Sequence, residues 1–241
     1  MKKWILALVI SMGAPLFIWA QNADSAEEYY RQGRYSAALG AYEEQLKNAP
    51  NSPYLYYNIG NCYFKMGSTG LAVANYYRAF RLDPRDEDIR HNLNLALESA
   101  GEKLVPGGVP EVLHKVYFYF SAAELKGLSV LALGVFSLLA CIWLLKRRLG
   151  RTTLVMLAVW VVITAWAGSV KRLEQENWAV VAVPAAELRS GPGMNFPASA
   201  NLSQGHLVVV QDTRHAWQEV VVTSQGVHGW MPADSLEKIS H

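Results

Sequence analysis

Apolar runs divide the chain, and the first of them, residues 1–20, has the pattern of a secretory signal peptide. It begins with Lys2 and Lys3, continues as an apolar core and ends at Ala20 before polar Gln21. Ile18 is bulkier than is usual three residues before a cleavage point. The stretch therefore fits either a signal peptide cleaved after Ala20 or an anchor helix that is retained.

Two uncharged runs, residues 127–145 and 152–170, predict transmembrane helices. Each has 19 residues, and a helix needs about 20 residues to cross the hydrocarbon core of a bilayer. Short cytoplasmic loops carry an excess of Lys and Arg, so the linker 146–151 is predicted to be cytoplasmic and both flanking segments to lie on the outer side. Its basic residues are Lys146, Arg147, Arg148 and Arg151.

Residues 101–126 are predicted to be a linker followed by an interfacial segment. The first ten of them are rich in Gly and Pro, which indicates irregular structure. The aromatic cluster 117–120 comes next, and amphipathic rings are typical of the membrane interface. His114 is interpreted as an interfacial polar residue.

A period of 34 residues predicts an all-α repeat domain over residues 21–100. Small residues let paired helices approach closely, glycine ends the first helix of each pair and proline stops the second. About two and a half repeats fit, and residues 87–100 form a closing helix. The matching pairs are Ala26 and Gly60, Tyr29 and Tyr63, Gly33 and Gly67, Ala38 and Ala72, Tyr42 and Tyr76, and Pro50 and Pro84.

Residues 53–86 resemble the tetratricopeptide (TPR) repeat, with Tyr56, Ile59, Gly60, Tyr63, Ala72, Tyr76, Ala79 and Pro84 at its signature positions. The resemblance implies a concave groove that binds an extended segment of a partner protein. Asn58 and Asn92 share one repeat position, where an amide can pair with a partner's backbone as donor and acceptor. The same positions also fit a merely solvated face. The inner-face candidates are Tyr54, Tyr57, Asn58, Asn61, Lys65, Asp88, His91 and Asn92.

Residues 177–240 contain short Val-rich runs separated by turn residues, which predict a small all-β barrel. Their motifs resemble those of bacterial SH3-like (SH3b) domains, and the resemblance implies a module that binds cell-wall peptide or protein. The two tryptophans are expected to fill the barrel, and the glycines of the first motif to permit a tight turn. The motif residues are Arg189, Ser190, Gly191, Pro192, Gly193, Trp217, Gly229 and Trp230.

Composition supports membrane segments and argues against nucleic-acid binding. Hydrophobic residues make up 51% of the chain and charged residues 17%, which is apolar for a soluble protein. Residues 21–105 carry nine Lys and Arg against eleven Asp and Glu, and residues 177–241 carry three against five. Neither polar part therefore offers the basic face that phosphate contacts need.

No constellation of residues predicts chemistry, so the chain is expected to be neither an enzyme nor a cofactor protein. Cys62 and Cys141 predict no disulfide and are interpreted as small buried hydrophobes. The spacings of His206, His215 and His228 fit no compact metal motif. An enzyme would need a nucleophile or metal with a base and an orienting group.

The order of the parts resembles that of BatE-like proteins of Bacteroides aerotolerance (Bat) operons. This resemblance implies a Gram-negative inner membrane with both folded domains in the periplasm. It also implies partner membrane proteins with von Willebrand factor A domains and an AAA-type ATPase. A non-enzymatic scaffold that binds such partners is the favoured function. The alternative is a peptidoglycan-binding envelope sensor or anchor that acts through the SH3-like domain.

Overall fold

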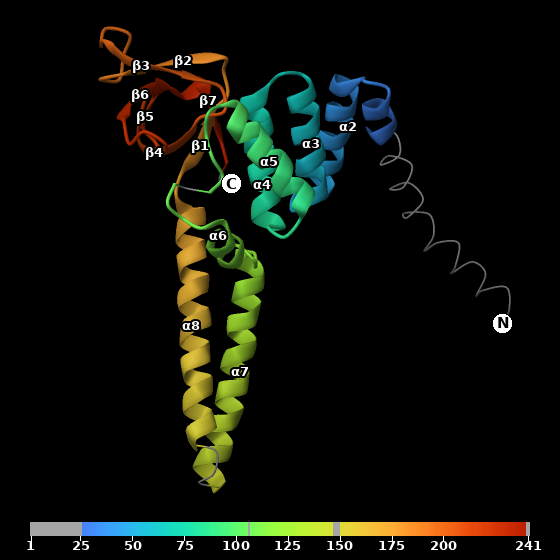
Figure 1. Cartoon of the computed structure of the whole chain (residues 1–241), viewed down its shortest axis with the longest axis vertical. Coiled ribbons are helices and arrows are strands. Elements are labelled where there is room, and N and C mark those ends of the chain that lie inside the picture. The colour runs from blue at the N-terminus through green and yellow to red at the C-terminus, as the bar shows by residue number, and fades with distance from the viewer. Residues whose placement is uncertain (1–25, 106, 147–149, 240–241) are drawn as a thin grey trace, which may run out of the picture.

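The computed structural model describes residues 26–105, 107–146 and 150–239. The predicted signal peptide lies outside these residues, as do Arg147 and Arg148 of the basic linker. Figure 1 shows helical repeats beside an antiparallel sheet, with a long two-helix hairpin extending away from both. The two folded parts therefore lie at the same end of the hairpin.

Antiparallel helices with a repeating turn build the first part. Gly33 and Gly67 end corresponding helices with φ of 73° and 79°, a left-handed conformation that favours glycine. The N–H groups of Arg34 and Ser68 close these turns by donating to the carbonyls of Tyr29 and Tyr63 at 2.9 and 3.0 Å. The helices are α2 (Tyr35–Asn48), α3 (Pro53–Lys65), α4 (Thr69–Leu82) and α5 (Glu87–Ser99), preceded by helical residues 26–31.

Small residues and tyrosines pack the repeats as the period predicts. A Cβ at Gly60 would lie 2.6 Å from a ring carbon of Tyr76, so only glycine lets α3 approach α4 this closely. Tyr42 and Tyr76 are both fully buried. Asp86 starts α5 by accepting hydrogen bonds from the N–H groups of Asp88 and Ile89, which is the usual role of a helix-capping aspartate.

The hairpin consists of α7 (Ala122–Lys146) and α8 (Gly150–Gln175), which follow the short helix α6 (Glu111–Tyr117). Both α7 and α8 are long and apolar enough to cross a membrane. Most of their side chains are exposed, so the hairpin presents an apolar surface on nearly all sides. Cys62 is buried as expected, but Cys141 is exposed on this surface, and the interpretation of it as a buried hydrophobe is wrong.

The C-terminal part is a seven-stranded antiparallel sheet in the order β3-β2-β6-β5-β4-β1-β7. In the described chain β3 and β7 form its two edges and the sheet does not close, so a closed barrel is not confirmed. A 3-10 turn, Ala233–Ser235, precedes β7. The strands are β1 (Trp178–Val181), β2 (Ala185–Arg189), β3 (Ala198–Ser203), β4 (Leu207–Arg214), β5 (Trp217–Val222), β6 (His228–Pro232) and β7 (Leu236–Lys238).

Mostly aliphatic side chains make up the core cluster of the sheet, and the two tryptophans that were expected to fill the barrel are not part of this cluster. Met231 belongs to this core cluster, so its strand neighbour Trp230 points to the opposite face. Trp230 is buried there, with the Arg214 guanidinium 5.1 Å from the centre of its ring. Trp217 is only partly buried. The cluster consists of Ala179, Val181, Ala186, Leu188, Leu202, Val208, Val210, Val220, Val222 and Met231.

The sheet docks directly on the repeats through α4. Val180, Leu207 and Ile239 are buried in the same core cluster as Val73 and Leu97 of the repeats. These contacts join two parts of the chain that the hairpin separates in sequence. The repeats and the sheet therefore share one hydrophobic core cluster, in addition to the clusters within each part.

A charged contact and two glycines fix this interface. Arg78 of α4 donates to the Glu237 carboxylate at 2.6 Å and also to the Lys238 carbonyl. A Cβ at Gly70 would lie 2.2 Å from the Val181 carbonyl oxygen, and one at Gly205 would lie 2.7 Å from Ala100 Cβ. The backbones approach so closely that no larger residue fits at either position.

Candidate functional site

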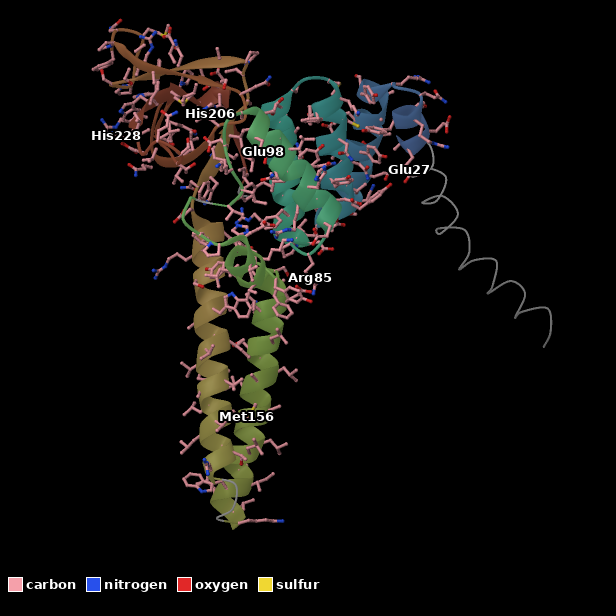
Figure 2. The ribbon with its side chains drawn as sticks, in the orientation of Figure 1. Glu27, Arg85, Glu98, Met156, His206 and His228 are labelled. Carbon is pink, nitrogen blue, oxygen red and sulfur yellow. The ribbon has the colours of Figure 1, made fainter. Side chains whose placement is uncertain are left out.

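Part of the predicted inner face of the repeats is open in this structure. The described strands pack mainly on α4, and several predicted inner-face residues of α3 and α5 are exposed. Tyr54 is 45% exposed and donates a hydrogen bond to Glu27, and Figure 2 shows Glu27 at the end of the repeats farthest from the sheet. Lys65, Asp88 and His91 are also exposed. The open face thus combines an aromatic ring with charges of both signs.

Three other predicted inner-face residues form a hydrogen-bond network inside the repeats. The Asn61 Oδ1 atom accepts hydrogen bonds from Tyr76 Oη at 2.7 Å and from Asn92 Nδ2 at 3.1 Å. Asn92 Nδ2 also donates to Tyr57 Oη at 3.0 Å. These bonds tie α3, α4 and α5 together, so the Asn92 amide hydrogens serve the fold. Asn58, its counterpart in the repeat, donates instead to the Tyr54 carbonyl of its own helix.

The structure therefore separates the predicted inner-face residues into two groups. Tyr54, Lys65 and His91 are available at the surface, whereas Tyr57, Asn61 and Asn92 hold helices together. Sequence reasoning also missed Leu95, which lies seven residues after Asp88 on α5 and is 45% exposed. Its helical spacing from Asp88 and His91 was the signal that would have found it.

Comparison with protein families identifies the repeats. A model described as "Tetratricopeptide repeat" matches residues 53–86, and one described as "TPR repeat" matches residues 26–67. Residues 26–86 thus match the tetratricopeptide repeat. Such repeats mediate protein–protein interactions, and the proteins that carry them are generally non-catalytic adaptors.

The curated relatives match 32–40% of this chain. Tetratricopeptide repeat protein 16 of Homo sapiens is 33% identical over 78 residues, which are 32% of this chain and 9% of the relative. The same protein of Macaca fascicularis gives the same values. Photosystem I assembly protein Ycf3 of Rippkaea orientalis (strain PCC 8801 / RF-1) is 31% identical over 107 residues, which are 40% of this chain and 62% of the relative. The chain thus spans less than two thirds of each of these relatives.

The motif that resembles SH3-like domains forms a loop between β2 and β3, and the Arg189 side chain holds this loop together by hydrogen bonds. Arg189 donates to the carbonyls of Met194 at 3.0 Å and Phe196 at 2.6 Å, and it also pairs with Glu187. A Cβ at Gly191 would lie 2.5 Å from the Phe196 ring. The glycine therefore makes room for this ring. Met194 and Phe196 are 71% and 43% exposed, so the loop presents an apolar tip.

The described residues contain no group of three or more His, Cys, Asp or Glu that could hold a metal ion. Figure 2 shows His206 and His228 at separate places on the sheet. His206 hydrogen-bonds to Ser203, and His215 occupies the tight turn between β4 and β5 with a φ of 56°.

A hollow of about 940 Å³, the junction cleft, lies where α4, α6, α7, α8 and β1 meet. Its walls are mostly apolar and aromatic, and include Phe80, Phe118, Trp166 and Trp178. Arg85, which Figure 2 shows where the repeats meet the hairpin, pairs with Glu124 of α7 at 2.6 Å. No sequence pattern pointed to this cleft, because its walls come from five separate elements.

His114, interpreted from the sequence as an interfacial polar residue, is buried in the wall of the junction cleft. Its ring is buried against Phe80 and Phe118, with centroid distances of 6.4 and 4.7 Å. Its Nδ1 atom has no hydrogen-bond partner among the described residues. Burial, helped by the nearby Arg90 cation and opposed by Glu111, lowers the pKa of His114 below its usual 6.5.

Replacing His114 by phenylalanine is expected to stabilise the protein more at pH 5.0 than at pH 7.5. The pKa of this histidine is lower in the folded protein than in the unfolded chain, so the unfolded chain binds the proton more readily. The folded protein therefore has its full stability above about pH 6.5 and loses stability as the pH falls. An unsatisfied buried polar group also costs about 1–3 kcal/mol. The charged neighbours are Arg90, Glu111, Arg81 and Glu174.

The measurement is the unfolding midpoint of the detergent-solubilised protein at the two pH values. The exposed His228 of β6 supplies the control variant, His228→Phe, which does not touch the cleft. A stability difference between His114→Phe and the unchanged protein that is the same at both pH values would contradict the prediction.

Proposed function

We propose that this protein is a non-enzymatic membrane scaffold that holds a segment of a partner protein on the open face of its TPR repeats. The observation that carries the proposal is the exposure of Tyr54, Lys65, Asp88 and His91 on that face, although the sheet is docked on the same repeats. The docked sheet and the hairpin then hold the repeats in one orientation relative to the membrane. A relative described as an assembly protein, Ycf3, accords with such a role.

The scaffold is proposed to sit in a Gram-negative inner membrane with both folded parts in the periplasm. The basic linker between α7 and α8 supports this orientation, since short cytoplasmic loops are rich in Lys and Arg. Docking of the sheet on α4 accords with one shared side for the two parts. The resemblance to BatE-like proteins of Bat operons implies partner membrane proteins with von Willebrand factor A domains.

Reversing charge on the open face is expected to release the partner. The double variant Lys65→Glu, His91→Glu places one new negative charge at the end of α3 and another three residues after Asp88 on α5. Partner recovery in mild detergent should fall at least about tenfold, which corresponds to about 1.4 kcal/mol of binding free energy. The measurement is quantitative mass spectrometry of proteins that co-purify with the full chain from its native membranes.

Lys47→Glu is the matched control for this experiment. Lys47 is an exposed lysine on α2, outside the predicted inner face, and its surface pair with Glu44 contributes little to stability. Equal recovery of membrane partners with the double variant and with the unchanged protein would refute groove binding. Substitution of Asn92 would be a poorer test, because its amide joins α5 to α3.

Peptidoglycan binding through the SH3-like segment is the second candidate. The exposed Met194 and Phe196 at the tip of the loop that Arg189 clasps favour it. The test is sedimentation of the full chain with purified cell-wall sacculi, with Met194→Ser, Phe196→Ser as the variant. The sheet alone is unsuitable, because removing the repeats would expose Val180, Leu207 and Ile239. Absence of pelleting would eliminate this candidate.

A further inference from the structure

The junction cleft continues along one face of α8 toward the middle of the predicted span. Val162, Trp166, Val170 and Glu174 line it at intervals of four residues, a spacing that places them on one side of a helix. Twelve residues of helix rise about 18 Å. The lower cleft therefore lies at hydrocarbon depth in a membrane that the hairpin crosses, and the upper cleft lies above it.

A smaller hollow of about 390 Å³ adjoins the cleft and has more charged residues in its lining than the cleft has. Both are lined by Arg81, Ser121, Ala122 and Glu174, and the small hollow adds Arg78 and Lys171. Arg81 donates to the Glu174 backbone carbonyl at 2.5 Å, and Arg78 pairs with Glu237. Three cations and the Glu174 carboxylate thus line the small hollow. One of the cations, Lys171, directly follows the predicted span 152–170.

The buried Nδ1 atom of His114 is an independent sign of a ligand in the cleft. Buried polar atoms almost always have a hydrogen-bond partner, and this one has none among the described residues. A neutral imidazole donates through one nitrogen and accepts through the other. A hydroxyl or ester oxygen in the cleft would therefore satisfy it.

We propose that the cleft and the adjoining hollow bind one phospholipid from the surrounding bilayer. Its phosphate lies beside Arg81 and Lys171, since cations form strong charge-assisted hydrogen bonds with phosphate oxygens. One acyl chain lies in the cleft against Trp166, and the glycerol ester region faces His114. The volume of the cleft falls within the range of about 300–1,000 Å³ that is usual for small-molecule sites.

The test uses the full chain in nanodiscs of phosphatidylglycerol that contain a small fraction of the same lipid with a photoactivatable acyl chain. After irradiation, mass spectrometry locates the crosslinked residues. Crosslinks are expected to concentrate on cleft residues such as Leu113 and Trp166. The membrane-exposed Leu131 and Leu138 on α7 report the ordinary surrounding lipid.

Two matched pairs of variants make the test specific. Ala165→Trp fills the cleft, while Ala158→Trp places the same bulk two helical turns away on the same exposed side of α8. Lys171→Gln removes an exposed cation of the hollow, while Lys126→Gln removes an exposed lysine of α7. The first member of each pair should reduce cleft crosslinking at least about fivefold, and the second should leave it unchanged.

Crosslinks spread evenly over the cleft and over Leu131 and Leu138 would overturn the proposal and show surrounding lipid only. Equal loss with both members of a pair would also overturn it. A helix of a partner protein crosslinked into the cleft in native membranes, with no lipid there, would assign the cleft to that partner instead. The two lysine variants alter exposed side chains, so they keep the test informative if Ala165→Trp disturbs folding.

Discussion

Replacing Gly70 by leucine is expected to detach the sheet from the TPR repeats. A Cβ at this position would lie 2.2 Å from the Val181 carbonyl oxygen and 2.9 Å from Ala182 Cα. Both atoms belong to the backbone, so no side-chain rotation relieves the overlap and α4 must move away from β1. Overpacking costs about 1–3 kcal/mol, and separation of the two parts would also expose Val180 and Ile239.

Limited proteolysis and thermal unfolding measure this effect in the detergent-solubilised full chain. Gly70→Leu should lower the unfolding midpoint and speed cleavage in the sheet several-fold. The control is Gly40→Leu, because a Cβ at Gly40 of α2 would have no neighbouring atom within 4 Å and leucine favours helix over glycine by about 0.5–1 kcal/mol. If both variants resist protease as well as the unchanged protein does, the interface does not hold the two parts together.

Local patterns in the sequence were enough to predict the repeats. Gly33 and Gly67 stand where helices end, and both adopt the left-handed conformation that the 34-residue period predicts. Gly60 faces Tyr76, as expected for a small residue between paired helices. These predictions are correct because each depends on residues that lie within about one repeat of one another. The spacing of such residues in the sequence determines their spacing in the fold.

Contacts between distant segments could not be predicted in the same way. Gly70 and Val181 are in contact although the whole hairpin separates them in sequence. No residue near either of them in the sequence indicates this contact. One clue existed in β1, where Ala179, Val180 and Val181 are apolar in succession and all buried. An unbroken apolar strand indicates cover on both faces, and the repeats supply the second cover.

The same limit applies at the candidate sites. His114 follows a Gly- and Pro-rich linker and precedes an aromatic cluster, so its neighbours in sequence suggested a membrane surface. Its neighbours in space include Phe80 and Arg90, which belong to the repeats. Asn92 was placed correctly on the third repeat-like helix, but only the fold shows that it donates to Tyr57 and Asn61.

The hairpin is expected to place both folded parts on one side of a membrane and the basic linker on the other. Single cysteines at Glu44 of α2 and Thr213 of β4 report the two folded parts, since both residues are exposed, and Leu149→Cys reports the linker. In spheroplasts a membrane-impermeant maleimide should label the first two nearly completely. It should label the third only after lysis, because short basic loops remain cytoplasmic.

The background for this labelling is the Cys141→Ala chain, in which Cys62 can remain. Burial raises the pKa of the Cys62 thiol to about 11, so it stays protonated and unreactive at neutral pH. Labelling at 44 but not at 213 would contradict the docking of the sheet on α4, whichever side the repeats occupy. Labelling of all three positions would show that α7 and α8 do not span the membrane. Labelling at 149 alone would show the opposite orientation of the hairpin in the membrane. Equal labelling at positions 44 and 213 thus tests the core cluster that joins the repeats to the sheet. Labelling at position 149 tests the orientation that the basic linker predicts.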